Sequence, residues 1–177
     1  MAYQSHPHSF HTIYCISDTD LRIHCDVDDQ AELVDLLMDR GEFGAREQSW
    51  EIIYYPYCKA IGTTPASDEY YRFRNAQNVF LGVPTLASGQ KLGAYTGLDS
   101  EYNEWILVST GTPGEYYIKA KDSSLYLKMS GTEPGVYIEL VDYAYKSIWA
   151  FQMSGTIPPM ALFRLPLNKM YNNLYIE

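Results

Sequence analysis

The sequence predicts an all-β protein built from three repeats of four short strands. Three observations lead to this fold class. Aromatic residues make up 15 % of the 177 residues, with 17 tyrosines, and tyrosine favours strands. Apolar and polar residues alternate over short segments between turn residues, which is typical of strands with one buried face. Each of the three tryptophans stands near the end of one such unit.

Two segments that begin alike make the repeats visible: "EYYRFRNAQNVFLGV" starts at Glu69 and "EYYIKAKDSSLYLKM" at Glu115. Each alternates, pauses at a polar turn and resumes with apolar residues, and Trp105 and Trp149 follow at similar distances. Upstream, "HTIYCISDTDLRIHCDV" precedes Trp50 in the same way. Units of this size cannot bury a hydrophobic face alone, so we expect the three to share one core. The predicted repeats cover about 11–57, 69–110 and 115–153.

The first repeat carries a helical signal between its second and third strands. The segment Asp-Gln-Ala-Glu that begins at position 29 has the pattern of a helix cap followed by a capping-box glutamate. Leu33, Leu36 and Leu37 follow at helical spacing, and Gly41 is a suitable C-cap. We therefore predict a short amphipathic helix over 29–40, inserted into the first repeat.

The second and third repeats each predict four strands separated by turns that contain asparagine, glycine or aspartate. After the third repeat comes a tail, 154–177, in which "ALFRLPL" alternates as an extended segment does. We expect this C-terminal extension to pack back across the repeats, within a single domain over 1–177. The predicted strands cover about 70–75, 79–83, 90–95 and 104–109 in the second repeat, and about 116–121, 125–129, 136–141 and 147–152 in the third.

Composition excludes several classes of partner. Thirteen basic and 22 acidic residues give a formal charge of −9, and the basic residues are scattered. This argues against nucleic acid and anionic membrane surfaces, which require a basic patch. No apolar stretch is long enough to span a membrane, and the first residues lack the pattern of a secretory signal. We expect a cytoplasmic protein, or one exported without a classical signal, whose partners are neutral glycans or proteins.

The sequence predicts no metal, no cofactor and no enzymatic activity. It contains no nucleophile elbow, no phosphate-binding glycine loop and no clear pair of catalytic carboxylates. The histidines of "HPHSFH" could chelate a metal, but histidines near a terminus usually do not, and we do not assign a site to them: His6, His8 and His11. The cysteines show no metal-type spacing, and we expect them to be buried free thiols: Cys15, Cys25 and Cys58.

The final strands of the three units resemble the Gln-x-Trp motif of ricin-B-like β-trefoils. They read Gln-Ser-Trp ending at Trp50, Asn-Glu-Trp ending at Trp105 and Ser-Ile-Trp ending at Trp149. The segment "YYIKAKDSSLYLKM" is similar to the opening of these units in fungal members, and the resemblance covers about 11–153. It implies a β-trefoil that binds carbohydrate as a lectin. The related fungal mycocypin-type trefoils inhibit cysteine or serine proteases through surface loops.

The resemblance implies a sugar-binding aspartate on the second strand of each unit, and this sequence has His24, Gly82 and Lys128 at those positions. A sugar site also needs an aromatic face and polar groups that bond to hydroxyls. The second repeat offers the best such set, the third a weaker one, and the first the weakest. Alternatively, the tyrosines cover the barrel rim and the polar residues form turns. The candidates are Tyr95, Asp99, Tyr102 and Asn103, then Tyr137, Asp142 and Tyr143, then Phe43, Glu47 and Gln48.

Carbohydrate binding is therefore the leading hypothesis, with a glycan or glycoprotein as partner. The alternative is a protease inhibitor that acts through the 29–40 insertion or through the loops at 84–90 and 130–135. A third possibility is a scaffold that binds another protein.

Overall fold

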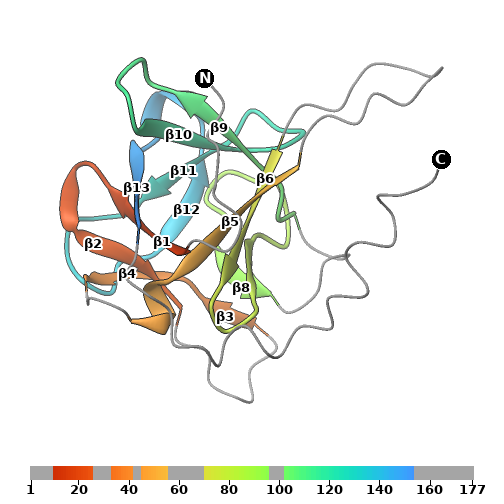
Figure 1. The fold of residues 1–177 in the computed structure, drawn as a ribbon. Coiled ribbons are helices and arrows are strands. Elements are labelled where there is room, and N and C mark those ends of the chain that lie inside the picture. The colour runs from red at the N-terminus through yellow and green to blue at the C-terminus, as the bar shows by residue number, and fades with distance from the viewer. Residues whose placement is uncertain (1–9, 26–32, 42–44, 56–69, 96–101, 154–177) are drawn as a thin grey trace, which may run out of the picture.

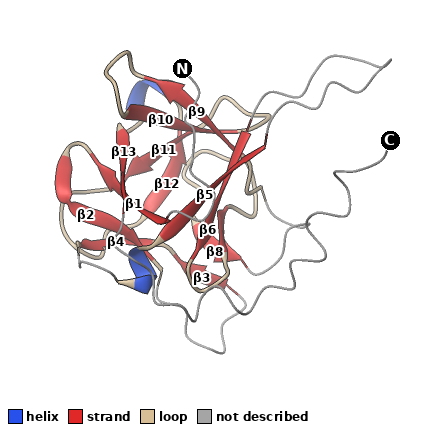
Figure 2. Ribbon diagram, viewed as in Figure 1, coloured by secondary structure: helices blue, strands red, loops and turns tan. Residues whose placement is uncertain are grey.

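The computed structural model describes residues 10–25, 33–41, 45–55, 70–95 and 102–153 (Figure 1). The predicted C-terminal extension, 154–177, and Cys58 lie outside the described residues. Strands dominate, and the helices within the described residues are two three-residue turns, η1 (Arg46–Gln48) and η2 (Tyr143–Tyr145) (Figure 2). The all-β class is confirmed. The strands are β1 (Phe10–Cys15), β2 (Asp18–His24), β3 (Leu33–Asp35), β4 (Leu37–Arg40), β5 (Trp50–Tyr55), β6 (Tyr70–Asn75), β7 (Phe80–Gly82), β8 (Gly93–Tyr95), β9 (Trp105–Ser109), β10 (Glu115–Ala120), β11 (Tyr126–Met129), β12 (Ile138–Val141) and β13 (Trp149–Met153).

Six strands close into a barrel (Figure 1). The first and last strands of the three repeats pair antiparallel in a ring, β1 with β5, β5 with β6, β6 with β9, β9 with β10, β10 with β13 and β13 with β1. Their inward side chains form one part of the core, and residues of the hairpins form the rest. Because the ring closes on itself, none of these six strands is left with an unpaired edge.

The three tryptophans occupy equivalent places in this barrel, and each is fully buried. Trp50, Trp105 and Trp149 pair in register with the last residue of the neighbouring repeat's first strand. Each indole Nε1 also donates a hydrogen bond to a carbonyl oxygen on the second strand of its own repeat. The acceptors are Ile23 at 3.0 Å, Leu81 at 3.1 Å and Leu127 at 3.4 Å. The predicted repetition is therefore real at the level of individual atoms.

The second and third strands of each repeat form a hairpin: β2 with β4, β7 with β8, and β11 with β12. Hairpins of different repeats hold one another through backbone hydrogen bonds. Leu36 N donates to Leu92 O at 3.2 Å, and Leu92 N donates to Ile138 O at 2.9 Å. These three side chains are at most 1 % exposed. The short β3 adds a further link, because it pairs with β8 of the second repeat.

The helix predicted over 29–40 is wrong wherever that segment is described. Residues 33–40 form β3 and β4, and β4 pairs with β2 so that Met38 lies opposite Ile23. Leu36 and Met38 are buried while Leu37 is 37 % exposed, which is the alternation of a strand. Over so short a segment, the spacing of the leucines fits both the period of a helix and the period of a strand. The segment forms a strand because it closes the first hairpin and because its backbone forms hydrogen bonds to the other repeats.

The strand predictions for the other two repeats are confirmed. β6 has the predicted bounds, and the remaining strands lie within one or two residues of the predicted segments or inside them. Cys15 and Cys25 are fully buried, as expected, and Cys15 is a free thiol.

Candidate functional site

The second repeat brings three of its four predicted site residues together around Gly82 on β7. A Cβ atom on Gly82 would lie 3.2 Å from Cδ2 of Tyr95, 3.3 Å from the carbonyl oxygen of Tyr102 and 3.4 Å from Cβ of Asn103. Gly82 also faces Gly93 across the hairpin. The glycine thus leaves room for the tyrosine ring to lie against the strand, in the place where the resemblance implies an aspartate.

These three residues differ greatly in exposure. Tyr95 is 7 % and Asn103 1 % exposed, whereas Tyr102 is 51 % exposed. Tyr102 is held in place because its backbone pairs with Val83, with N–O distances of 3.0 and 3.1 Å. The buried Nδ2 of Asn103 has no hydrogen-bond partner among the described residues. Asp99, the fourth predicted residue, lies outside the described part of the chain.

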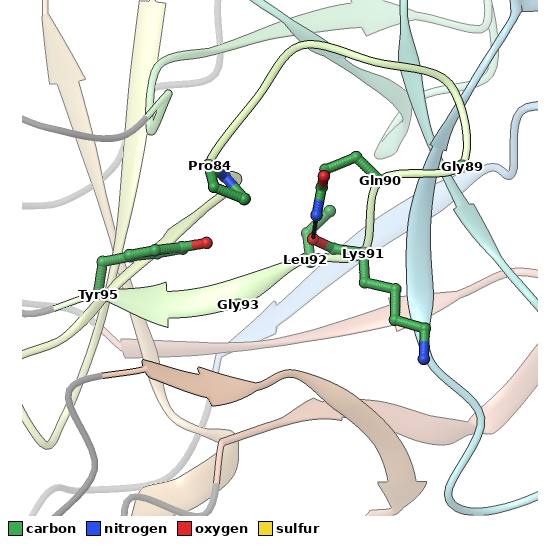
Figure 3. A pocket seen from close by; sticks show the side chains of 7 residues that line it. All are labelled: Pro84, Gly89, Gln90, Lys91, Leu92, Gly93 and Tyr95. Atoms are coloured by element: carbon green, nitrogen blue, oxygen red, sulfur yellow. Dashed lines mark hydrogen bonds between the residues drawn. The ribbon is translucent and has the colours of Figure 1, made fainter.

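A pocket of about 210 Å³ is lined in part by Tyr95. Figure 3 shows the hydroxyl of Tyr95 pointing into it, with Pro84 on one side and Gln90 and Leu92 on the other. The Gln90 amide is oriented from within its own loop, because Oε1 accepts from the Thr85 hydroxyl at 3.0 Å and Nε2 donates to the carbonyl of Lys91 at 3.2 Å. The pocket is lined by Pro84, Gly89, Gln90, Lys91, Leu92, Gly93 and Tyr95.

The loop that forms this pocket is anchored to the third repeat. Gly89, whose φ of +83° is in the left-handed region that favours glycine, donates its N–H to Leu140 O at 2.7 Å. Gln90 O accepts from Leu140 N at 2.9 Å. The Lys91 ammonium lies 4.4 Å from the ring centroid of Tyr137 in the third repeat. The pocket walls are therefore preformed by contacts between two repeats.

The pocket combines apolar walls with a few polar groups. Pockets for drug-sized molecules measure roughly 300–1,000 Å³, so this one suits a group no larger than a single sugar ring. The phenol of Tyr95 can both donate and accept a hydrogen bond, and so can the amide of Gln90. Pro84, which is exposed, offers apolar contact for the C–H groups of a ring.

The third repeat does not gather its predicted residues into one site. Lys128 and Glu139 occupy the places of Gly82 and Gly93, and their side chains form an ion pair at 3.3 Å. Tyr137 is half-buried under Lys91 before β12 begins, whereas Asp142 is exposed after β12 ends. The ion pair fills the space that the two glycines leave open in the second repeat.

Two of the first repeat's three candidates, Gln48 and Glu47, lie in the described part of the chain. Gln48 is 1 % exposed, and its Nε2 donates to the carbonyl of Arg40 at 2.7 Å, which is a structural role. Glu47 is half-buried, and its backbone oxygen accepts from Cys25 N at 2.9 Å. Phe43 lies outside the described residues.

A charged network stands next to Asn103 in the chain. The Glu104 carboxylate accepts hydrogen bonds from Arg72 and Lys121, each at 2.7 Å. Burial alone raises the pKa of Glu104, but the bonds from Lys121 and Arg72 outweigh it and hold this pKa below its usual value. The carboxylate therefore stays ionised and links the second repeat to the third.

Sequence reasoning found Tyr95 but missed the pocket into which its hydroxyl points. Pro84 lies in the 84–90 loop of the protease-inhibitor alternative, and Gln90 and Lys91 lie at the start of the strand predicted over 90–95. Proline and glycine in the 84–90 loop indicate a turn. No local pattern shows that the turn folds back toward Tyr95, because the bonds that hold it run to Leu140, far along the chain.

Within the described residues, no three histidine, cysteine or acidic side chains are grouped so that they could hold a metal ion. His6 and His8 lie outside those residues. In the part of the chain that the structure describes, no helix is long and apolar enough to cross a membrane.

No family model and no curated protein sequence matches the chain. Its structure resembles that of a designed threefold-symmetric protein, ThreeFoil, with a TM-score of 0.64 and 15 % identity over 80 % of this chain and 96 % of that one. It also resembles a ricin B-like lectin from Macrolepiota procera in complex with lactose, with a TM-score of 0.62 and 17 % identity over 85 % of this chain and 99 % of that one. For a lectin from Polyporus squamosus, the TM-score is 0.60 and the identity is 15 % over 86 % of this chain and 50 % of that one. The chain is therefore a β-trefoil protein, with the fold of the ricin-B-like lectins.

Proposed function

We propose that this protein is a non-catalytic carbohydrate-binding module and that the pocket of the second repeat takes one sugar ring of a glycan or glycoprotein. The observation that carries the proposal is the preformed pocket in which the Tyr95 hydroxyl and the Gln90 amide meet apolar walls. Sugar recognition needs this combination of fixed polar groups and apolar contact. The similar structures support it, since the Macrolepiota procera lectin is in complex with lactose and the Polyporus squamosus lectin with a sialylated epitope.

The remaining predicted residues take different parts in this proposal. Tyr102, half-exposed and held by its pairing with Val83, offers an aromatic face for a second sugar ring. Asn103 is too deeply buried to meet the glycan, so we assign it to holding Tyr102 and Tyr95 in place. Asp99 stays a prediction.

The experiment is a glycan-array screen followed by calorimetry of the best-bound glycan against Tyr95→Phe. This variant removes only the hydroxyl. We expect affinity to fall roughly threefold to tenfold, the loss of one net hydrogen bond. Tyr95→Ala is unsuitable, because truncating a 7 % exposed ring costs about 3 kcal/mol or more of stability. The matched control is Tyr14→Phe, a hydroxyl deletion on the half-buried β1 tyrosine of the first repeat.

Equal affinity of Tyr95→Phe and the wild type would remove the pocket from the proposal. A silent array would contradict carbohydrate binding itself. Papain and trypsin inhibition assays belong beside the array, because inhibition together with silence on the array would favour the protease-inhibitor alternative.

A further inference from the structure

Three tyrosines surround one lysine on the surface of the third repeat. Tyr117 on β10, Tyr126 on β11 and Tyr143 in η2 place their ring centroids 4.2, 5.9 and 3.2 Å from the ammonium nitrogen of Lys146. Tyr143 meets Tyr126 edge-on at 5.4 Å and Tyr117 at 6.4 Å between centroids. We call these four residues the Lys146 cluster. Its rings come from different elements and fix one another's orientation.

The charge of Lys146 has no acidic partner within the described residues. Its ammonium donates to the backbone oxygen of Tyr143 at 2.9 Å, and no carboxylate of that part of the chain lies within 4 Å. By contrast, Lys121 and Lys128 both form ion pairs. An ammonium has three donors, so Lys146 keeps donors available for a ligand. An anion would supply the missing partner.

The Lys146 cluster is also open to solvent on its aromatic side. Tyr143 is 59 % exposed although two rings support it. Such a fixed but exposed ring can stack on the C–H face of a sugar with little loss of side-chain entropy. Burial, with a smaller effect of Tyr143, raises the pKa of Tyr126, so its phenol stays a protonated donor. An exposed aromatic ring and a lysine without an acidic partner among the described residues therefore stand side by side.

We propose that the Lys146 cluster is a second binding site, for a saccharide that carries a carboxylate or sulfate. The acid group bonds to the Lys146 ammonium, and the sugar ring lies against Tyr143. The net charge of −9 repels anions at long range, so contact at the cluster rather than electrostatic steering provides the affinity. This site is separate from the pocket of the second repeat and does not depend on it.

The test is an NMR titration of the full chain with three matched probes. Methyl β-D-glucuronide has ring and carboxylate, methyl β-D-glucoside has the ring alone, and sodium acetate has the carboxylate alone. We expect the glucuronide to shift the backbone signals of Tyr143 and Lys146, and to bind about fivefold more tightly than either other probe, the effect of one exposed ion pair. Equal binding of glucuronide and glucoside would overturn the proposal, and equal binding of acetate would reduce the site to a carboxylate contact without sugar recognition.

Variants of Lys146 and Tyr143 test the contributions of the charge and of the aromatic ring separately. Lys146→Met should lose about the same fivefold in glucuronide affinity while Lys146→Arg keeps most of it, because arginine retains the charge. Tyr143→Ala should also weaken binding. Tyr145→Ala, which truncates a 68 % exposed tyrosine of the same turn, should not. Unchanged affinity in Lys146→Met would contradict the proposal. Tyr95→Phe should leave the glucuronide-induced shifts of the Tyr143 and Lys146 signals unchanged, which keeps this result distinct from that of the second-repeat pocket.

Discussion

Gly82 stands where the resemblance to ricin-B-like trefoils implies an aspartate, and its neighbours give a packing reason for the glycine. The Tyr95 ring and the backbone of Tyr102 lie closer than ordinary van der Waals distance to the place of its missing Cβ, at 3.2 and 3.3 Å. Lys128 and Glu139 fill the equivalent places of the third repeat with an ion pair. In the second repeat, the ring of Tyr95 packs closely against this glycine and its hydroxyl reaches the pocket.

Gly82→Ala should therefore destabilise the protein and disturb the proposed sugar pocket. The new methyl group would press on backbone and ring atoms that cannot easily move, and we expect a loss of about 1–3 kcal/mol in the free energy of unfolding. Urea denaturation measures this loss. The control is Gly41→Ala, where the nearest atoms to a Cβ belong to the flexible Arg22 side chain, at 3.3 to 3.4 Å. Similar losses for the two variants would contradict the packing role of Gly82.

The candidate site was only partly predictable from the sequence. Tyr95, Tyr102 and Asn103 were predicted because Tyr95 ends the third strand and the other two stand in the loop just before the tryptophan. Burial could not be deduced in the same way. Asn103 is almost fully buried and Tyr102 half-exposed although they are neighbours, because only their contacts with β7 decide which side chain turns inward.

At the scale of elements, β4 is the segment whose local signals and final structure disagree. Leu33, Leu36 and Leu37 have helical spacing after a capping-box pattern, whereas Leu36 and Met38 have the spacing of a strand. The hydrogen bond from Met38 N to Val136 O at 2.8 Å and the pairing with β2 require the strand. Local propensity is a weak effect when a hairpin must close the fold.

Substitution by aspartate should reveal this alternation. Met38→Asp would place an unpaired carboxylate in the core, since Met38 is fully buried, and should cost more than about 3 kcal/mol. Leu37→Asp changes a 37 % exposed side chain on the opposite face and should cost about 1 kcal/mol or less. Thermal unfolding followed by circular dichroism compares the two. A larger loss for Leu37→Asp would show that the alternation of β4 is assigned to the wrong face.

At the scale of the whole molecule, Glu104 joins two repeats. Its carboxylate binds Arg72 on β6 and Lys121 just after β10. The pKa of Glu104 is lower in the folded protein than its usual value. Its contribution to stability is therefore present above the unfolded-state pKa and is lost as the pH falls through the folded-state pKa.

Acid should therefore abolish the stabilising effect of this network. We expect Glu104→Gln to be less stable than the wild type at pH 7, and the difference to shrink progressively below about pH 5 as Glu104 becomes protonated in the wild type. Urea denaturation across this range gives the difference in free energy of unfolding. Glu133→Gln is the control, an exposed carboxylate without an ion pair among the described residues, and should cost little at any pH. A difference for Glu104→Gln that does not change with pH would contradict the linkage.

The sequence by itself determined the all-β class, the threefold repetition and the places of the tryptophans. These features follow from alternation and turn residues that recur in each unit, so they can be recognised within short segments. Only the tertiary structure decided that residues 33–40 form strands and that the loop before β8 makes a pocket beside Tyr95. Both depend on hydrogen bonds between different repeats, such as Gly89 N to Leu140 O. Contacts between residues so far apart in the chain leave no local sequence pattern. In residues 33–40 they outweighed the helical pattern of the local sequence.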